Sequence, residues 1–195
     1  GRGGRHAANL AHRVVAADLV AIMDLDRARV HAVADACRGA AVFTDAHALI
    51  DDQSVEAVIV ATPDQTHAEL ALACIAVGKP VLVEKPLGIS LDEAWRVVEA
   101  ESATGRRLVQ VGLMRVYDPP HVALKQLILD GEIGRPLLFR GIHRNLGLPG
   151  HNVAADLIVG AAVHDIHSAR WIMGDEVATV YVSRVVAEPD RPETG

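Results

Sequence analysis

The sequence predicts an α/β protein in which helices alternate with the strands of a parallel sheet, followed by the start of a second α/β domain. Along the first 112 residues, short apolar runs ended by turn signals alternate with helical patterns. After Gly112, longer helices separate alternating, antiparallel-type strand patterns. We therefore divide the chain into residues 1–112 and 113–195, and expect an open, largely antiparallel sheet that is incomplete in the second domain.

The first elements are expected to be a helix, a strand and a second helix. Residues 6–16 are rich in alanine and predict a helix. Residues 18–23 form an apolar run closed by Asp24, which is typical of a strand covered on both faces. A helix is then expected over about 27–38, ending near Gly39.

The same alternation continues to the end of the first domain. The strongest strand signal is at 55–61, and Ser90 with Glu93 forms a capping box that opens a helix ending at Gly105. Together the elements describe a Rossmann-like sheet without its first strand. The others, in order, are a strand at 42–43, a helix at 45–51, a helix at 67–77, a strand at 80–84 and a strand at 108–111.

The second domain is predicted from helical and alternating patterns in turn. Both ends of the chain look cut, because no strand precedes the glycines at Gly1 and a single strand precedes Gly195, so we expect further sequence on both sides. The expected elements are a helix at 120–130, a strand at 136–143, a loop at 144–153, a helix at 156–173 and a strand at 177–187.

The bulk composition is that of an ordinary soluble globular protein. Hydrophobic residues make up 50% of the 195 residues and charged residues 23%. The net charge of −6, without a basic stripe, argues against nucleic acid and anionic membranes as partners, and no apolar run is long enough to span a bilayer. Cys37 and Cys74 lack metal-ligand spacing, which favours a reduced, cytoplasmic setting.

The glycine-rich start is a candidate cofactor site. Gly1, Gly3, Gly4 and Arg5 open the first helix, where backbone N–H groups and the helix N-terminus can bind a pyrophosphate. Asp24, at the end of the next strand, is placed to accept hydrogen bonds from a ribose diol. Because its carboxylate would repel a 2′-phosphate, NAD is favoured over NADP. The alternative is that Asp24 is only a turn residue.

Lys85 is the first candidate for chemistry. It follows a buried strand, and open parallel sheets bind ligands at the carboxyl ends of their strands. An ammonium there can stabilise the alkoxide that hydride loss requires. The bond to Pro86 restrains Lys85 and has access to the cis form. The alternative is a solvent-exposed loop lysine.

His164 is the second candidate for chemistry. A neutral imidazole accepts the hydroxyl proton during alcohol oxidation. His167 lies three residues on, on an adjacent face of the same helix turn. We expect no metal, because no third ligand is suitably placed to complete a zinc site. The alternatives are a zinc pair and a core histidine.

Several loose motifs occur together along nearly the whole chain: Ala61-Thr62-Pro63 with His67, Gly78–Val81 leading to Glu84-Lys85-Pro86, Gln110–Arg115, Gly131–Pro136, and His164-Asp165-Ile166 with Trp171 and Gly174. Their order and spacing resemble the glucose–fructose oxidoreductase, inositol dehydrogenase and rhizopine-catabolism protein family. Within it, the likeness is closest to inositol 2-dehydrogenases.

The resemblance implies NAD(P)-dependent hydride transfer at a secondary alcohol of a sugar or cyclitol, by a Rossmann domain followed by an oligomer-forming α/β domain. A homodimer or homotetramer is expected. Lys85 and His164 fall on the family's catalytic lysine and histidine. The other residues implied are Thr62, Pro63, His67 and Glu84 for the cofactor, and Met114, Arg115, His143, Asn145, Gly160 and His167 for the substrate.

Three positions depart from the inositol dehydrogenase pattern. Gly160 stands where an aspartate orients the histidine, Ala161 where a hydroxyl residue is frequent, and His167 where a second aspartate lies. The phosphate loop is also one residue short between Gly4 and His6. Since hydroxyl specificity depends on hydrogen-bond partners, these departures leave the substrate open.

Three functions remain. In a dehydrogenase, His164 takes the hydroxyl proton and Lys85 stabilises the developing negative charge. Gly160 in place of the aspartate favours instead a catalytically silent, cofactor-binding sensor of the same fold. A third interpretation keeps the enzyme but changes the reaction, to a keto-sugar reductase, a glycosidase-like redox cycle or an oxidoreductase with tightly bound cofactor.

Overall fold

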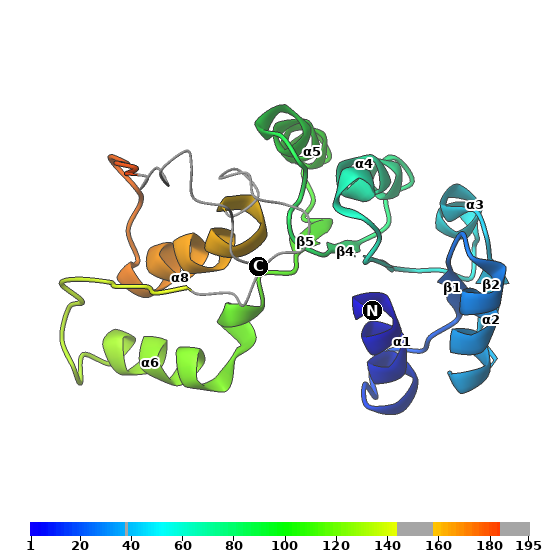
Figure 1. The fold of residues 1–195 in the computed structure, drawn as a ribbon, viewed down its shortest axis with the longest axis horizontal. Coiled ribbons are helices and arrows are strands. Elements are labelled where there is room, and N and C mark those ends of the chain that lie inside the picture. Colours follow the sequence, from blue (N-terminus) through cyan, green and yellow to red (C-terminus); the bar gives the residue numbers. More distant parts are fainter. Residues whose placement is uncertain (38, 144–157, 184–195) are drawn as a thin grey trace, which may run out of the picture.

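The computed structural model describes residues 1–37, 39–143 and 158–183, and its first domain alternates helices and strands as predicted (Figure 1). Its elements are α1 (Arg2–His12), β1 (Ala21–Met23), α2 (Arg27–Ala36), β2 (Ala41–Phe43), α3 (Ala46–Asp51), β3 (Val58–Val60), a 3₁₀ turn (Asp64–Thr66), α4 (His67–Ala76), β4 (Val81–Val83), α5 (Leu91–Ala103) and β5 (Val109–Val111).

The parallel strands form two sheets. One contains β1 and β2, and the other contains β3, β4 and β5 in that order, with Val58 opposite Val81 and Val81 opposite Val109. In a Rossmann sheet the first strand lies between the second and the fourth. A sheet without that strand is divided at this point, which agrees with the predicted Rossmann-like sheet lacking its first strand (Figure 1).

The hydrophobic core lies between the three-stranded sheet and helices α4 and α5. Val83 on β4 and Ala71 and Cys74 on α4 are fully buried, and Val97 on α5 is almost so. Burying a valine of this kind stabilises the fold by roughly 1.5–3 kcal/mol. Strand β3, at Val58–Val60 within the run predicted at 55–61, therefore anchors the domain. Strand β1, at Ala21–Met23 within the run predicted at 18–23, is only half-buried along its length and lacks the double cover that we predicted, because it lies outside this sheet.

Hydrogen bonds from backbone N–H groups to side chains stabilise the start of several helices and of one strand. The Ser90 hydroxyl accepts the Glu93 N–H at 3.2 Å, while the Glu93 carboxylate accepts the Ile89 N–H at 2.9 Å. The predicted capping box is thus present, with its return bond one residue earlier than expected. Glu101 accepts the N–H groups of Leu108 and Val109, both at 2.7 Å, and fixes the beginning of β5.

Helix α1 begins earlier than predicted. It runs from Arg2 to His12, so that Gly3 and Gly4 lie in its first turn rather than in a loop before residue 6, and it ends before the predicted end at residue 16. A glycine in a helix costs about 1 kcal/mol relative to alanine, which does not prevent the helix from starting here.

The second domain is described in part, by a 3₁₀ turn (Met114–Tyr117), α6 (Pro119–Leu129), a π-helical turn (Ile158–Ala162) and α8 (Val163–Met173). The strands expected at 136–143 and 177–187 are wrong as far as the structure describes them: 136–143 and 177–183 have no regular structure. A strand needs a neighbour to complete its hydrogen-bond ladder, and neither segment has one among the described residues. The predicted largely antiparallel sheet is therefore not seen here, and the loop at 144–153 lies outside the described residues.

None of the helices within the described ranges is long and apolar enough to cross a membrane.

Candidate active site

Lys85, in the first half of the chain, contacts the turn that leads into the helix carrying His164, in the second half. Lys85 follows β4 directly, and its side chain is buried, with 8% of the residue exposed. Its Nζ donates a hydrogen bond to the carbonyl oxygen of Gly160 at 3.1 Å. Gly160 lies in the π-helical turn that leads into α8, on which His164 is 7% exposed. The predicted lysine is thus not a solvent-exposed loop residue, and its bond to Pro86 is cis.

The π-helical turn matters because it brings a main-chain oxygen to the lysine. Single π turns interrupt α-helices at functional sites more often than elsewhere. At Gly160 a Cβ atom would meet no atom within 4 Å, so the turn leaves open space at this position. The Gly160 carbonyl is the acceptor that the lysine ammonium uses.

His164 is held in its neutral form by its surroundings. Burial lowers the pKa of His164 below its ordinary value of 6.5, and the positive charges of Lys85, Arg115 and Arg2 lower it further, while Asp165 acts in the opposite direction. Within the described residues its Nδ1 is buried without a hydrogen-bond partner. A buried, unpaired nitrogen costs about 1–3 kcal/mol and marks a place where a ligand can bind.

The carboxylate of Asp165 interacts with two of the predicted substrate residues. Its Oδ2 lies 2.8 Å from Nδ1 of His143, and its Oδ1 lies 3.8 Å from Nη2 of Arg115. Arg115 also lies 3.4 Å from Nε2 of His121. Met114 remains 61% exposed. Asp165 is recognisable in the sequence only as part of a motif, because the partners of its carboxylate lie far away along the chain.

Glu84 ties the beginning of α1 to the end of β4. Its Oε2 accepts a hydrogen bond from Nη1 of Arg2 at 2.9 Å, and its Oε1 lies 2.8 Å from Nε2 of His6. Burial acts to raise the pKa of Glu84, but the bonds from His6 and Arg2 and the charge of Arg2 outweigh it, so that the pKa is lowered. Gly112 lies against this residue, since a Cβ there would be in van der Waals contact with Oε2 of Glu84, at 3.4 Å.

The predicted cofactor residues lie at the start of α1 and after strands β1, β3 and β4. Gly1 caps α1 without any side-chain hydrogen bond to its first turn, and Arg5 is exposed. Free N–H groups at a helix N-terminus bind anions. Asp24, after β1, accepts the N–H of Asp26 at 3.0 Å and lies 3.5 Å from Nη1 of Arg29. It is therefore a turn residue, and its side chain is still partly exposed.

Two predicted residues are used within the protein. The hydroxyl of Thr62, which is followed by Pro63, lies 2.7 Å from the Thr66 hydroxyl. The ring of His67 is 1% exposed, with both nitrogens close to backbone carbonyls, so the ring itself offers no contact to a cofactor.

His167 lies one helical turn after His164 but has different neighbours. Burial and the charge of Arg170 lower its pKa, and its Nδ1 is also buried without a partner among the described residues. The part of the chain that the structure describes contains no cluster of three or more His, Cys, Asp or Glu side chains arranged to hold a metal ion. Asn145, the remaining predicted substrate residue, lies outside the described residues.

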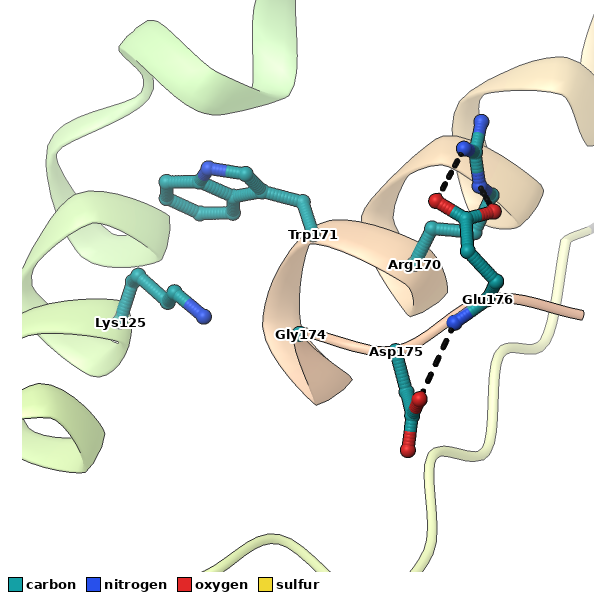
Figure 2. A pocket seen from close by; sticks show the side chains of 6 residues that line it. All are labelled: Lys125, Arg170, Trp171, Gly174, Asp175 and Glu176. Carbon is teal, nitrogen blue, oxygen red and sulfur yellow. Dashed lines mark hydrogen bonds and ion pairs between the residues drawn. The ribbon is translucent and has the colours of Figure 1, made fainter.

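A shallow hollow at the far end of α8 is separate from this site. Figure 2 shows that it is lined by Lys125, Arg170, Trp171, Gly174, Asp175 and Glu176. Arg170 is bound to Glu176 by two hydrogen bonds, of 3.0 and 2.7 Å, so the main charges of the hollow satisfy each other. It adds nothing to the chemistry at Lys85 and His164.

Comparisons with known proteins identify the family to which this chain belongs. Residues 1–113 match the model of an oxidoreductase family with an NAD-binding Rossmann fold, and residues 121–194 match the C-terminal domain of the same Gfo/Idh/MocA family. The chain belongs to this family of NAD-binding Rossmann-fold oxidoreductases.

Its similar relatives include inositol dehydrogenases. The chain is 50% identical to an inositol 2-dehydrogenase of Rubrobacter xylanophilus over 97% of the chain and 54% of that protein, and 44% identical to inositol 2-dehydrogenase 2 of Saccharopolyspora erythraea over 98% and 58%. The structure of myo-inositol dehydrogenase from Lactobacillus casei with NAD(H) and myo-inositol matches with a TM-score of 0.83 and 30% identity, over 90% of this chain and 52% of that one. This chain thus spans about half the length of the relatives it matches.

Proposed function

We propose that the protein carrying this chain is an NAD-dependent oxidoreductase of the inositol 2-dehydrogenase type, which oxidises a secondary alcohol of a cyclitol or sugar. The observation that carries the proposal is a buried lysine, hydrogen-bonded to the π turn, together with a buried histidine on the helix that follows. The pKa of this histidine is lowered, and its Nδ1 has no hydrogen-bond partner among the described residues. The inositol dehydrogenases among its relatives support the substrate class.

Two features of the described chain support NAD as the cofactor. The uncapped start of α1 suits the pyrophosphate, and the carboxylate of Asp24 suits the ribose diol. NAD held there would supply the hydride acceptor for the substrate carbon. His164 takes the hydroxyl proton, and the Lys85 ammonium donates a hydrogen bond to the oxygen as its negative charge develops. The alcohol becomes a ketone, with one proton and one hydride removed.

The experiment that tests the function is an assay of NADH formation by the whole protein on a panel of inositols, aldoses, and amino- and deoxy-sugars. Turnover of a polyol with NAD is expected. A protein that binds NAD but oxidises nothing on the panel would instead be a silent sensor of this fold, the function that Gly160 in place of a carboxylate favours.

The pH dependence of kcat/KM is expected to show an acid limb below pH 6.5, because a base is active only when unprotonated and the pKa of His164 lies below 6.5. Measurements of kcat/KM at a series of pH values across the acid range check this. In Asp165→Asn the limb moves to still lower pH, because Asp165 acts to raise that pKa. An acid limb above pH 6.5 in the unchanged protein contradicts the assignment of His164 as the base.

The choice of cofactor is expected to depend on Asp24. In Asp24→Ala the preference for NAD over NADP falls by about tenfold, because the charge that opposes a 2′-phosphate is lost. Dissociation constants for both cofactors, measured by fluorescence titration at one salt concentration, test this. Asp18→Ala, which removes an acid from the segment before β1, is the control and leaves the ratio unchanged; an unchanged ratio in Asp24→Ala removes Asp24 from the cofactor site.

Gly160→Asp is expected to raise turnover of myo-inositol. The position has open space for a side chain and its backbone does not need glycine, so the variant folds. A carboxylate there adds a hydrogen-bond partner for substrate hydroxyls, a gain of about tenfold in kcat/KM. Gly160→Asn, which keeps the size and removes the charge, separates packing from charge. A fall in kcat/KM for every polyol tested would show that the bare turn is a feature of a different substrate.

We also propose the division into residues 1–112 and 113–195, a homodimer or homotetramer, and a cytoplasmic location. The change of pattern after Gly112 supports the division. The unpaired, buried Cys37 and Cys74 support the reduced compartment.

A further inference from the structure

His67 connects the two loops that follow β3 and β4. It is the first residue of α4, and only 1% of it is exposed. Its Nδ1 lies 2.6 Å from the carbonyl oxygen of Pro86, and its Nε2 lies 3.0 Å from that of Thr62. These carbonyls stand at the carboxyl ends of neighbouring parallel strands, the edge where such sheets bind ligands.

The ring acts as a donor toward the loops. Carbonyl oxygens only accept hydrogen bonds, and imidazole carries a proton on one nitrogen when neutral and on both when charged. In either form at least one N–H is directed at a loop carbonyl. Because the ring is buried, losing this bond would leave a loop carbonyl without its partner inside the protein.

Lys85 depends on one of these loops for its position. It directly precedes Pro86, whose carbonyl His67 holds, and its own ammonium reaches Gly160 at 3.1 Å. We propose that His67 is a positioning residue for Lys85: it holds the Lys85-Pro86 turn against the Thr62 loop, so that the ammonium stays at the turn that leads to His164. The proposal rests on the proposed function in so far as Lys85 acts in turnover.

The experiment compares His67→Ala and His67→Asn with Cys74→Ala in the whole protein. Cys74 is also buried on α4 but packs in the hydrophobic core, so its truncation matches the loss of packing without touching the loops. The first readout is the rate at which an amine-acylating reagent labels Lys85, measured by mass spectrometry relative to Lys125 in the same molecule. This rate needs no turnover.

His67→Ala is expected to raise the labelling ratio at least about fivefold and to lower kcat about thirtyfold, with little change in the Kd for NAD. Asn, whose amide can donate near the position of Nδ1, restores most of both values. Cys74→Ala changes neither, even where its unfolding midpoint falls as far.

An unchanged labelling ratio in His67→Ala overturns the proposal, and so does a kcat loss equal to that of Cys74→Ala at the same stability. If the unchanged protein oxidises no polyol while the ratio rises only in His67→Ala, the positioning role stands and the proposed function is what fails.

Discussion

His164→Ala is expected to lower kcat/KM for the true polyol substrate by about 10³-fold, within the range that a positioned general base contributes. The physical reason is that, among the described residues, the groups whose charges act on His164 are cations and a carboxylate that is already engaged. Lys85 and Arg115 are cationic neighbours of His164, and the carboxylate of Asp165 is shared between Arg115 and His143. The measurement is steady-state NADH formation, with NAD binding followed separately.

The control for this prediction is His31→Ala, which removes an exposed histidine from α2, far from the site in the sequence and the fold. It should leave both turnover and NAD binding unchanged. His164→Gln keeps the size of the side chain and should be nearly as inactive as the alanine variant. If His164→Ala retains more than about a tenth of the rate, general-base catalysis by His164 is wrong.

Patterns that depend on near neighbours in the chain predicted the structure well. The run at 55–61 predicted a strand, which forms at Val58–Val60, because a short apolar run bounded by turn signals fits a strand. Ser90 with Glu93 predicted a helix start, because a cap needs only residues three apart. Lys85 at the end of a buried strand was found for the same reason, since the position of a strand end follows from the local sequence.

Features that depend on distant partners were not predictable in this way. The segment 136–143 alternates like a strand, yet a strand forms only where another can pair with it. The π turn at Gly160 and the pairing of Asp165 with His143 arise from contacts across the fold. The motif around His67 is visible in the sequence, whereas the two carbonyls around its ring are not.

Lys85→Ala is expected to lower kcat by about 10²–10³-fold, the usual loss when one donor to a developing oxyanion is removed. Lys85→Arg keeps the charge but not the compact ammonium that reaches Gly160, so it should also lose most of its activity. Lys125→Ala removes a positive charge near the other end of α8 and serves as the matched control, with no change in rate.

The two Lys85 variants should differ in their pH profiles. The charge of Lys85 lowers the pKa of His164, because it disfavours the imidazolium. Lys85→Ala therefore raises that pKa and moves the acid limb of kcat/KM to higher pH, whereas Lys85→Arg leaves the limb in place while the rate falls. If both variants lose activity but neither moves the limb, the lysine acts on the substrate oxygen without sensing His164. If the limb moves and the rate is retained, the lysine tunes the base and is not needed to stabilise the alkoxide.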